Sequence, residues 1–169
     1  MSGKNASSAD NQQERLVKNF YLAGFIDGEG CFYVGIVPSK YNKIGWQVIC
    51  EFHVSQNAKG LNILEDIKTT LKCGYIKRNH PASQRDKTFV FVAKNEKDLT
   101  EKVLPFFEKH PLISGKKDDF EKFKQVMFLR REKQHLTTKG LKKVVELAYS
   151  MNSGSARKIL KKKLLKSLD

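Results

Sequence analysis

Two stretches in the first third of the chain alternate between apolar and polar residues, with the period of two that is typical of half-buried β-strands. In residues 31–37, which Pro38 ends, one face collects Phe32, Val34 and Ile36. In residues 46–55, one face collects Trp46, Val48, Cys50, Phe52 and Val54. The pattern predicts two strands with one face in a core and the other face available to a ligand.

Apolar residues recur at helical spacing over residues 59–71, which predicts an amphipathic helix that covers one side of the sheet. Residues 75–79 and 88–92 alternate again and predict a second hairpin. Asn95 is a candidate N-cap for the next helix, and Pro105 marks the expected end of that helix.

Two further helices are expected later in the chain, one through Phe120–Phe128 and one through Leu141–Met151. A first helix is expected to begin near Asn11, with Asp10 as its N-cap. The order α-β-β-α-β-β-α with extra helices predicts an α/β protein of the α+β type. Its sheet is expected to have four antiparallel strands.

The two ends of the chain differ from this pattern. Residues 1–9 are rich in Ser, Asn and Lys, and we expect them to be disordered before a domain over residues 10–153. Residues 154–169 form a basic tail in which leucines spaced four apart alternate with lysines. An amphipathic helix docked on the domain is the first interpretation of this tail. Phosphate contact and binding to a membrane surface are the alternatives.

Charge narrows the choice of partner. The 169 residues contain 32 Lys and Arg against 18 Asp and Glu, a formal net charge of +14, and the sequence pI is about 9.7. This balance points to a polyanion, with nucleic acid first and an anionic membrane surface second. No stretch approaches the ~18 apolar residues of a membrane-spanning helix.

The N-terminus and the cysteines bear on the expected compartment. Residues 1–10 lack the apolar segment of a signal peptide, so we expect a protein that is not secreted. The three cysteines contain no CxxC pair and are expected to be reduced packing residues, and a zinc site is not expected.

The end of the first helix carries the densest chemistry. Asp27 and Glu29 fall in its last turn, where carboxylates oppose the helix dipole unless a cation compensates them. Gly24 and Gly28, four residues apart and beside Ala23, leave a helix face with almost no side chains. Such a face suits the close approach of another backbone.

Residues 22–29, Leu-Ala-Gly-Phe-Ile-Asp-Gly-Glu, resemble the LAGLIDADG signature of homing endonucleases. Residues 107–112, 115–120 and 135–152 are similar to the downstream part of the same family. The resemblance covers roughly residues 11–153, and the chain carries one copy of the motif. The chain is similar also to the C-terminal half of family members that carry two motifs. The resemblance implies an αββαββα fold with a saddle-shaped sheet. It also implies that the protein is a site-specific double-strand DNA endonuclease.

The resemblance also implies catalytic roles. Glu29 would hold a divalent metal with help from the Gly28 carbonyl, and Gln56 would organise water. Lys116 would be the basic residue near the scissile phosphate, although Lys116 and Lys117 could equally be a surface pair. Mg²⁺ is the expected metal, Mn²⁺ could replace it, and Ca²⁺ is expected to support binding without cleavage. Asp27 is expected to play a structural role, with a place beside the metal ligands as the alternative.

The open face of the sheet is the expected DNA-binding surface, because β-ribbons fit the major groove of DNA. Alternation and loop position predict the contact residues, with Cys31, Lys43, Lys87 and Val90 as further candidates. The predicted set is Tyr33, Val37, Lys40, Gln47, Ile49, Glu51, His53, Tyr75, Lys77, Asn79, Arg85 and Thr88.

One acidic motif cannot cut two strands from one centre, so the double-strand interpretation requires two chains and a pseudo-palindromic target. The expected homodimer interface consists of Leu22, Ala23, Gly24, Ile26, Asp27 and Gly28. The alternative from another functional class is an RNA-binding intron maturase or a non-cleaving DNA-binding protein on the same scaffold. The family occurs in mitochondria, chloroplasts and bacteria, so we expect an intracellular protein without assigning its compartment.

Overall fold

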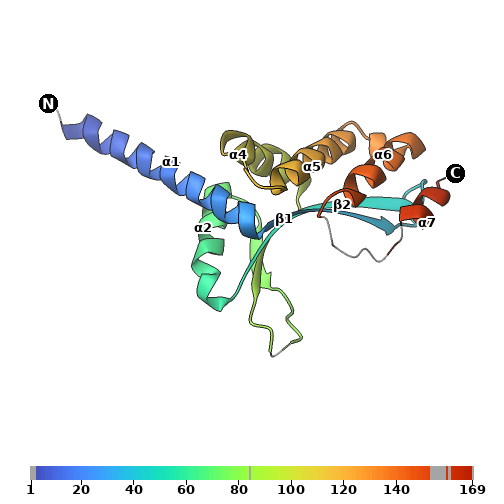
Figure 1. Cartoon of the computed structure of the whole chain (residues 1–169), viewed down its shortest axis with the longest axis horizontal. Helices are drawn as coiled ribbons and strands as arrows, with labels where there is room; N and C mark the ends of the chain where they lie inside the picture. Colours follow the sequence, from blue (N-terminus) through green and yellow to red (C-terminus); the bar gives the residue numbers. More distant parts are fainter. Residues whose placement is uncertain (1–2, 84, 153–158, 160, 169) are drawn as a thin grey trace.

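The computed structural model of the chain describes residues 3–83, 85–152, 159 and 161–168. A helix of 27 residues, α1 (Gly3–Glu29), precedes a hairpin of β1 (Gly30–Pro38) and β2 (Trp46–Gln56). A short 3₁₀ turn, η1 (Ala58–Gly60), leads into α2 (Leu61–Leu71). Figure 1 shows α1 extending away from the body of the molecule.

The second half of the chain completes the sheet and then builds a helical layer. The strands β3 (Tyr75–Arg78) and β4 (Phe89–Ala93) are followed by α3 (Glu96–Asp98), a π-helical segment η2 (Leu99–Val103) and α4 (Leu104–Lys109). The last elements are α5 (Lys116–Arg131), η3 (Gln134–Leu136), α6 (Thr138–Tyr149) and α7 (Lys161–Lys166).

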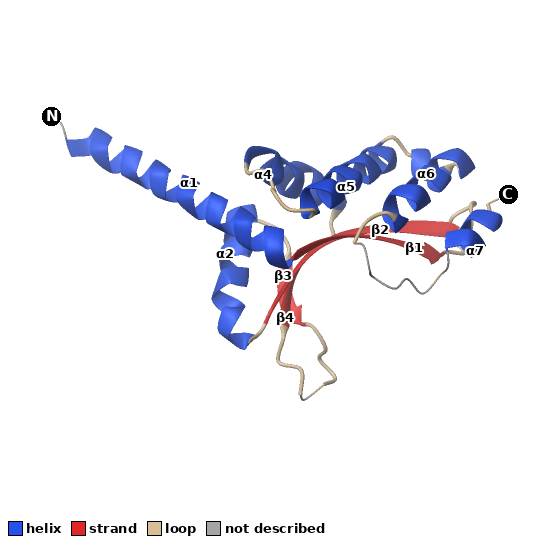
Figure 2. Cartoon of the chain, in the orientation of Figure 1, coloured by secondary structure: helices blue, strands red, loops and turns tan. Residues whose placement is uncertain are grey.

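The four strands form one antiparallel sheet in the order β1-β2-β4-β3. β2 is the long central strand: its first part pairs with β1, and Phe52–Gln56 also pairs with β4. Figure 2 shows the sheet curving strongly along its length, with α4, α5 and α6 on one side of it. The predicted α+β architecture with four antiparallel strands is confirmed.

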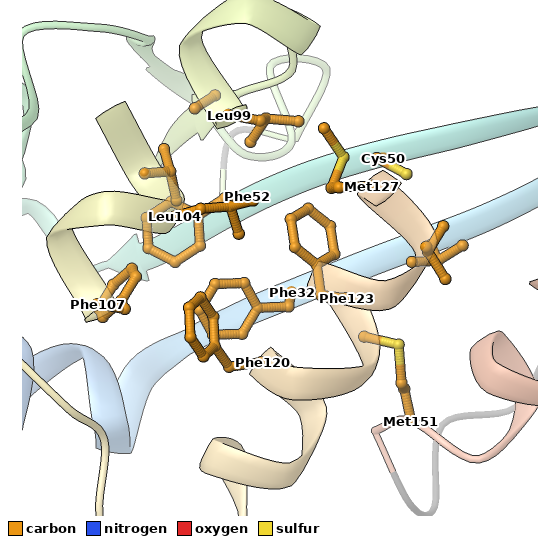
Figure 3. Close-up of a cluster of buried hydrophobic side chains, with 14 of the residues drawn as sticks. Phe32, Cys50, Phe52, Leu99, Leu104, Phe107, Phe120, Phe123, Met127 and Met151 are labelled. Atoms are coloured by element: carbon orange, nitrogen blue, oxygen red, sulfur yellow. The ribbon is translucent and has the colours of Figure 1, made fainter. Parts of the chain in front are cut away.

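A cluster of phenylalanines joins the sheet to the helical layer (Figure 3). The ring of Phe32 from β1 stacks on Phe52 from β2 at 5.2 Å between centroids, and contacts Phe107, Phe120 and Phe123 at 5.3–5.4 Å. Burial of one such side chain stabilises the fold by about 1.5–3 kcal/mol. The cluster fixes which face of the sheet is packed, and therefore which face stays open.

Three expectations about element ends are wrong. α1 begins at Gly3, so Asp10 lies inside the helix and does not cap it. Pro105 does not end a helix, because it lies in the first turn of α4, where a missing N–H costs no hydrogen bond and the helix continues to Lys109. Thr88 lies outside β4, which begins one residue later.

The expected N-cap is confirmed at Asn95, whose side chain accepts hydrogen bonds from the backbone N–H groups of Lys97 and Asp98. The described part of the basic tail is docked on the domain. Leu164 and Leu168 are buried, and the indole N–H of Trp46 donates to Ser167 Oγ at 3.2 Å. The prediction for residues 153–158, 160 and 169 lies outside the described residues. No helix in the described part of the chain has the length and apolar character needed to cross a membrane.

Candidate active site

An exposed carboxylate lies where α1 passes directly into β1. Glu29 ends the helix and Gly30 starts the strand, with no residue between them. A β-carbon on Gly30 would lie 2.7 Å from the Ile26 carbonyl oxygen, so this abrupt change from helix to strand requires glycine. Glu29 is exposed and has no hydrogen-bond or ion-pair partner within the described residues. Its carboxylate is therefore available to a cation from outside the chain.

Asp27, two residues earlier, is occupied by the loop between α4 and α5. Its Oδ2 accepts hydrogen bonds from the backbone N–H groups of Ile113 at 3.0 Å and Ser114 at 2.9 Å, and its Oδ1 accepts from Ser114 Oγ at 2.6 Å. Burial acts to raise the pKa of Asp27. The hydrogen bonds from Ser114 and Ile113, together with nearby Lys116, outweigh burial and hold the pKa below the ordinary 3.8.

We expect Asp27→Ala to lower the free energy of unfolding by about 1–2 kcal/mol at neutral pH, because three donors lose a charged acceptor. The folded-state pKa is depressed, so this contribution is present above the unfolded pKa and disappears as pH falls through the folded pKa. Denaturant unfolding at several pH values measures the difference between wild type and variant, which should narrow below about pH 4.

Asp10→Ala is the matched control, since Asp10 is an exposed aspartate of the same helix without a hydrogen-bond or ion-pair partner in the described part of the chain. A difference between Asp27→Ala and wild type that stays constant from neutral to acidic pH would contradict the assigned role.

Lys116 brings a positive charge to the same corner. It is the first residue of α5, and its ammonium group donates a hydrogen bond to the Gly30 carbonyl oxygen. The backbone N–H of Lys116 donates in turn to Ser114 Oγ at 3.1 Å, so the loop that holds Asp27 also orients the start of α5. Lys117 is exposed. The two lysines are thus distinguished by the contact that Lys116 makes one residue from Glu29.

Gln56 is the last residue of β2, two positions beyond Val54, which pairs with Gly30. This register brings Gln56 to the same end of the sheet as Glu29. Its side chain packs over the start of α2: a β-carbon on Gly60 would lie 2.6 Å from Gln56 Oε1. In the described structure the amide therefore contacts Gly60.

The oxygen atoms at the corner fit a hard divalent cation. Mg²⁺ and Ca²⁺ prefer carboxylate and carbonyl oxygens, and Glu29 supplies the first kind. The Gly28 carbonyl belongs to the last turn of α1, where carbonyls lack an intrahelical partner. No group of three or more His, Cys, Asp or Glu side chains that could hold a metal occurs among the described residues. If a divalent cation binds at Glu29, water, a bound phosphate or a second copy of the motif would have to supply its remaining oxygen ligands.

The open face of the sheet carries polar and aromatic side chains from paired strands. Tyr33 lies opposite Glu51, and Cys31 lies opposite His53. His53 Nε2 is 2.8 Å from Glu51 Oε2, and its ring stacks on Tyr33 at 6.1 Å between centroids. Alternation placed these side chains on one face but did not reveal that they form one connected group.

The remaining predicted contact residues fall on or beside the same face. Val37 pairs with Gln47, Tyr75 and Lys77 are exposed on β3, and Ile49 is half-buried. Val90, a weaker candidate, is only 5% exposed, because Ser55 and Lys77 flank it on the two neighbouring strands. Such a covered side chain cannot contact bases. The exposed loop candidates are Lys40, Lys43, Asn79, Arg85 and Lys87.

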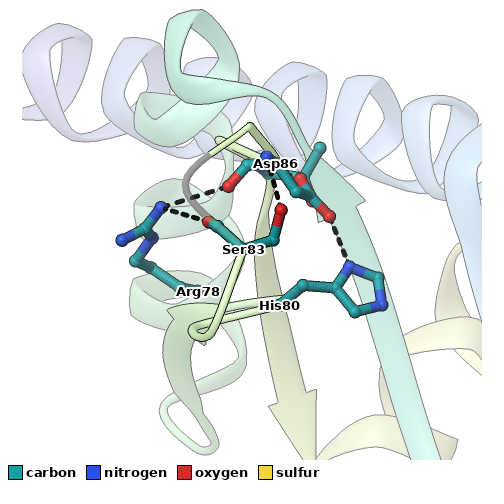
Figure 4. A network of polar contacts seen from close by, with 5 residues as sticks. Arg78, His80, Ser83 and Asp86 are labelled. Carbon is teal, nitrogen blue, oxygen red and sulfur yellow. Dashed lines mark hydrogen bonds and ion pairs between the residues drawn. The ribbon is translucent and has the colours of Figure 1, made fainter.

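A hydrogen-bonded network orders the loop between β3 and β4 (Figure 4). Arg78 donates to the carbonyl oxygens of Ser83 at 3.2 Å and Asp86 at 3.1 Å, and His80 contacts the Asp86 carboxylate. Hydrogen bonds from Thr88, and then from His80, lower the pKa of Asp86 to about 2. Thr88 is thus engaged within the loop, and the exposed Arg85 is carried on an ordered scaffold.

The model of the LAGLIDADG endonuclease family matches residues 22–127, more than half of the chain, and includes the whole corner described above. The chain belongs to this family of DNA endonucleases. The LAGLIDADG helix is the C-terminal part of α1, and its eighth motif position is Glu29.

The chain is similar both to proteins of about its own length and to longer proteins. The "Probable intron-encoded endonuclease 2" of Neurospora crassa is 34% identical over 138 residues, which cover 81% of this chain and 30% of the relative. The chain spans 30% and 25% of the length of two of the curated relatives that it matches. The crystal structure of the homing endonuclease I-TnaI has a TM-score of 0.80 and 34% identity, with 89% of this chain and 97% of that chain covered. I-SmaMI, bound to an uncleaved DNA target in the presence of calcium ions, has a TM-score of 0.74 and 37% identity, with 82% and 46% covered.

The exposed side of the LAGLIDADG helix contains only two residues of the predicted interface, Gly24 and Gly28. Leu22, Ala23 and Ile26 are buried in the chain's own core, and Asp27 contacts the α4–α5 loop. Gly24 and Gly28 are exposed, and a β-carbon at either position would meet no atom within 4 Å. They continue a stripe at helical spacing that includes two exposed side chains which sequence reasoning missed, Val17 and Tyr21. The same periodicity applied upstream of the motif would have found both residues.

Proposed function

We propose that the protein is a site-specific endonuclease that hydrolyses phosphodiester bonds in both strands of a long duplex target with the help of a divalent metal. The observation that carries the proposal is the corner at which the exposed Glu29 carboxylate and the Lys116 ammonium group flank Gly30. Family membership and the DNA target in the I-SmaMI structure support a duplex DNA substrate.

Glu29 and the Gly28 carbonyl would hold the ion, with Mg²⁺ as the expected metal and Mn²⁺ as a substitute. A bound divalent ion would supply a hydroxide nucleophile near neutral pH and would stabilise charge on the reacting phosphate. Ca²⁺ is expected to support binding without cleavage, which agrees with the uncleaved target that I-SmaMI holds in the presence of calcium.

Lys116 would place its ammonium group near the scissile phosphate and stabilise the negative charge that develops there. Gln56 would turn from Gly60 and orient the attacking water, so its role requires a change of side-chain rotamer on DNA binding.

Target recognition would use the open sheet face. Bidentate amides such as Gln47 and Asn79 suit adenine, and Lys77 suits guanine. Glu51 could accept a hydrogen bond from cytosine only after its contact with His53 is released or shared. The other expected contacts are Tyr33, Val37, Lys40, Ile49, Tyr75, Arg85 and Thr88.

We infer that two copies pair through the exposed stripe of α1, formed by Val17, Tyr21, Gly24 and Gly28. A two-fold axis at this stripe would bring two Glu29 carboxylates close together, and their mutual repulsion favours shared divalent cations. Such a homodimer would bind a pseudo-palindromic site of twice the span that one sheet covers. The same stripe would pair two halves of a longer chain.

Selection of cleaved molecules from a randomised duplex library tests the function. With Mg²⁺ we expect recovery of one long, pseudo-palindromic sequence, and with EDTA we expect no cleaved product. A protein that enriches a sequence by binding but never cuts it with Mg²⁺ or Mn²⁺ would rule out the enzymatic proposal.

A further inference from the structure

A pocket of about 820 Å³ lies in the helical layer, between the middle of α1, the end of α2 and the η2–α4 segment. Residues from all three elements form its wall, which brings together Arg15, Lys72 and Lys109 from distant parts of the sequence. The helices α2 and α4 pack on the core side of the sheet, through residues such as Leu64 and Phe107. The pocket is therefore separate from the open sheet face.

Cations are concentrated in this pocket. Five of its thirteen lining residues are Lys or Arg, about twice their share of 32 in 169 for the whole chain. Glu101 is the single carboxylate in the lining. Like charges gathered around one hollow repel each other, so a bound polyanion would stabilise the arrangement.

Two of the five cations are held by carboxylates outside the lining. Lys18 is 2.5 Å from Asp66, and Lys102 is 2.5 Å from Asp98 while also donating to the Lys72 carbonyl oxygen at 2.9 Å. Arg15, Lys72 and Lys109 form no ion pair within the part of the chain that the structure describes.

His110 is a well-packed residue of the pocket lining. His110 is only 6% exposed, its Nδ1 donates to the Phe106 carbonyl oxygen at 2.9 Å, and its ring contacts Phe106 and Phe20 at 4.7 and 5.1 Å between centroids. Arg15 and Lys109 belong to helices and Lys72 caps the end of α2, so none of the three unpaired cations lies within a long loop.

The pocket stays open in the proposed dimer. Successive residues of an α-helix are separated by about 100° around the helix axis. Arg15 and Asn19 therefore lie about 160° around α1 from Val17, on the side of the helix opposite the exposed stripe. A subunit paired on that stripe would not cover the pocket. A duplex on the open sheet face would not cover it either, because the core lies between them.

We propose that this pocket binds the phosphates of a single nucleic-acid strand, independently of the duplex on the sheet. Its volume is in the range of ordinary ligand pockets, about 300–1,000 Å³. Duplex DNA is stiff over a persistence length of about 150 base pairs and cannot bend into a hollow of this size, whereas a flexible strand can follow it. Arg15 on α1 and Lys109 on α4 lie on different walls and would contact successive phosphates.

The test uses fluorescence anisotropy of the full chain with labelled oligouridylate and oligothymidylate of equal length. The double variant Arg15→Glu, Lys109→Glu should weaken binding of the preferred strand by about 10-fold or more. The slope of log K against log salt concentration should become shallower by about 1.4, because each of the two lost phosphate contacts contributes about 0.7 for a single strand. Lys139→Glu with Lys143→Glu, which makes the same charge change on the exposed surface of α6, should leave affinity within about two-fold.

Duplex DNA is titrated in parallel, so that failure of this proposal is distinguished from failure of the endonuclease proposal. The Arg15/Lys109 variant should bind duplex as the Lys139/Lys143 control does. Preference for oligouridylate identifies RNA as the source of the phosphates, and preference for oligothymidylate identifies single-stranded DNA. Equal strand affinity in the two double variants, or equal loss for strand and duplex in the pocket variant, would overturn the proposal.

Discussion

Replacement of Glu29 by glutamine should abolish cleavage and leave DNA binding nearly unchanged. Glutamine has the size of glutamate but no charge, so it keeps the packing at the end of α1 and removes the anionic metal ligand. Metal assistance stabilises the transition state by several kcal/mol, so we expect the cleavage rate to fall by on the order of 1,000-fold or more. Single-turnover cleavage with Mg²⁺ and anisotropy binding with Ca²⁺ measure the two properties separately.

Glu65→Gln is the matched control for this variant. Glu65 is an exposed carboxylate on α2, where it pairs with Lys68 at 3.5 Å on the helical layer. The same chemical change there should leave both cleavage and binding at wild-type levels. Cleavage by Glu29→Gln within about tenfold of wild type, a difference of only about 1.4 kcal/mol, would exclude Glu29 as the metal ligand.

Replacement of Gly24 by leucine should separate folding from assembly. A β-carbon at Gly24 meets no atom within 4 Å in the isolated chain, and leucine favours helix over glycine by roughly 0.5–1 kcal/mol. The monomer should be as stable as wild type or more so. Overpacking costs about 1–3 kcal/mol per site, and the variant side chain occurs twice in a two-fold interface. Association should therefore weaken by roughly 30-fold or more.

Sedimentation velocity and thermal unfolding measure the two effects of Gly24→Leu, and cleavage of both strands should fall with dimer content. Lys139→Leu adds a comparable apolar side chain to the exposed start of α6 and should keep the assembly intact. A Gly24→Leu protein that sediments as wild type does would show that the stripe on α1 is not the interface.

The alternation of apolar and polar residues predicted the sheet well, because on β1 and β2 the burial of each side chain is recorded in that strand's own sequence. Phe32 on β1 and Phe52 on β2 alternate with polar or half-buried residues, and in these two strands the alternation separates the core face from the open face. On β4 both neighbours of Phe91, Val90 and Val92, are buried as well, so burial there does not follow the alternation. Element ends were predicted less well, since they depend on neighbouring elements. Pro105 signals a break by itself, yet the π-helical segment before it lets the helix restart at the proline.

Contacts between distant residues could not be predicted from spacing. Asp27 and Ser114 are 87 positions apart, and only folding reveals that the loop before α5 uses this carboxylate. The pocket formed by Arg15, Lys72 and Lys109 has no signature in any one segment. The motif could point to Glu29 because its eight residues are contiguous in the sequence, and the role of Glu29 as a metal ligand stays a prediction.

The direct passage from α1 into β1 at Glu29 and Gly30 has a mechanical consequence. With no hinge residue between the helix that would pair two subunits and the strand that would contact DNA, the angle between the two sheets is rigidly set. One extra base pair at the centre of a target would shift one half-site by about 3.4 Å and turn it by roughly 34°. Such an assembly could not contact both half-sites after that rotation. The enzyme would therefore discriminate against a target with the wrong spacing between half-sites as strongly as against one with the wrong sequence.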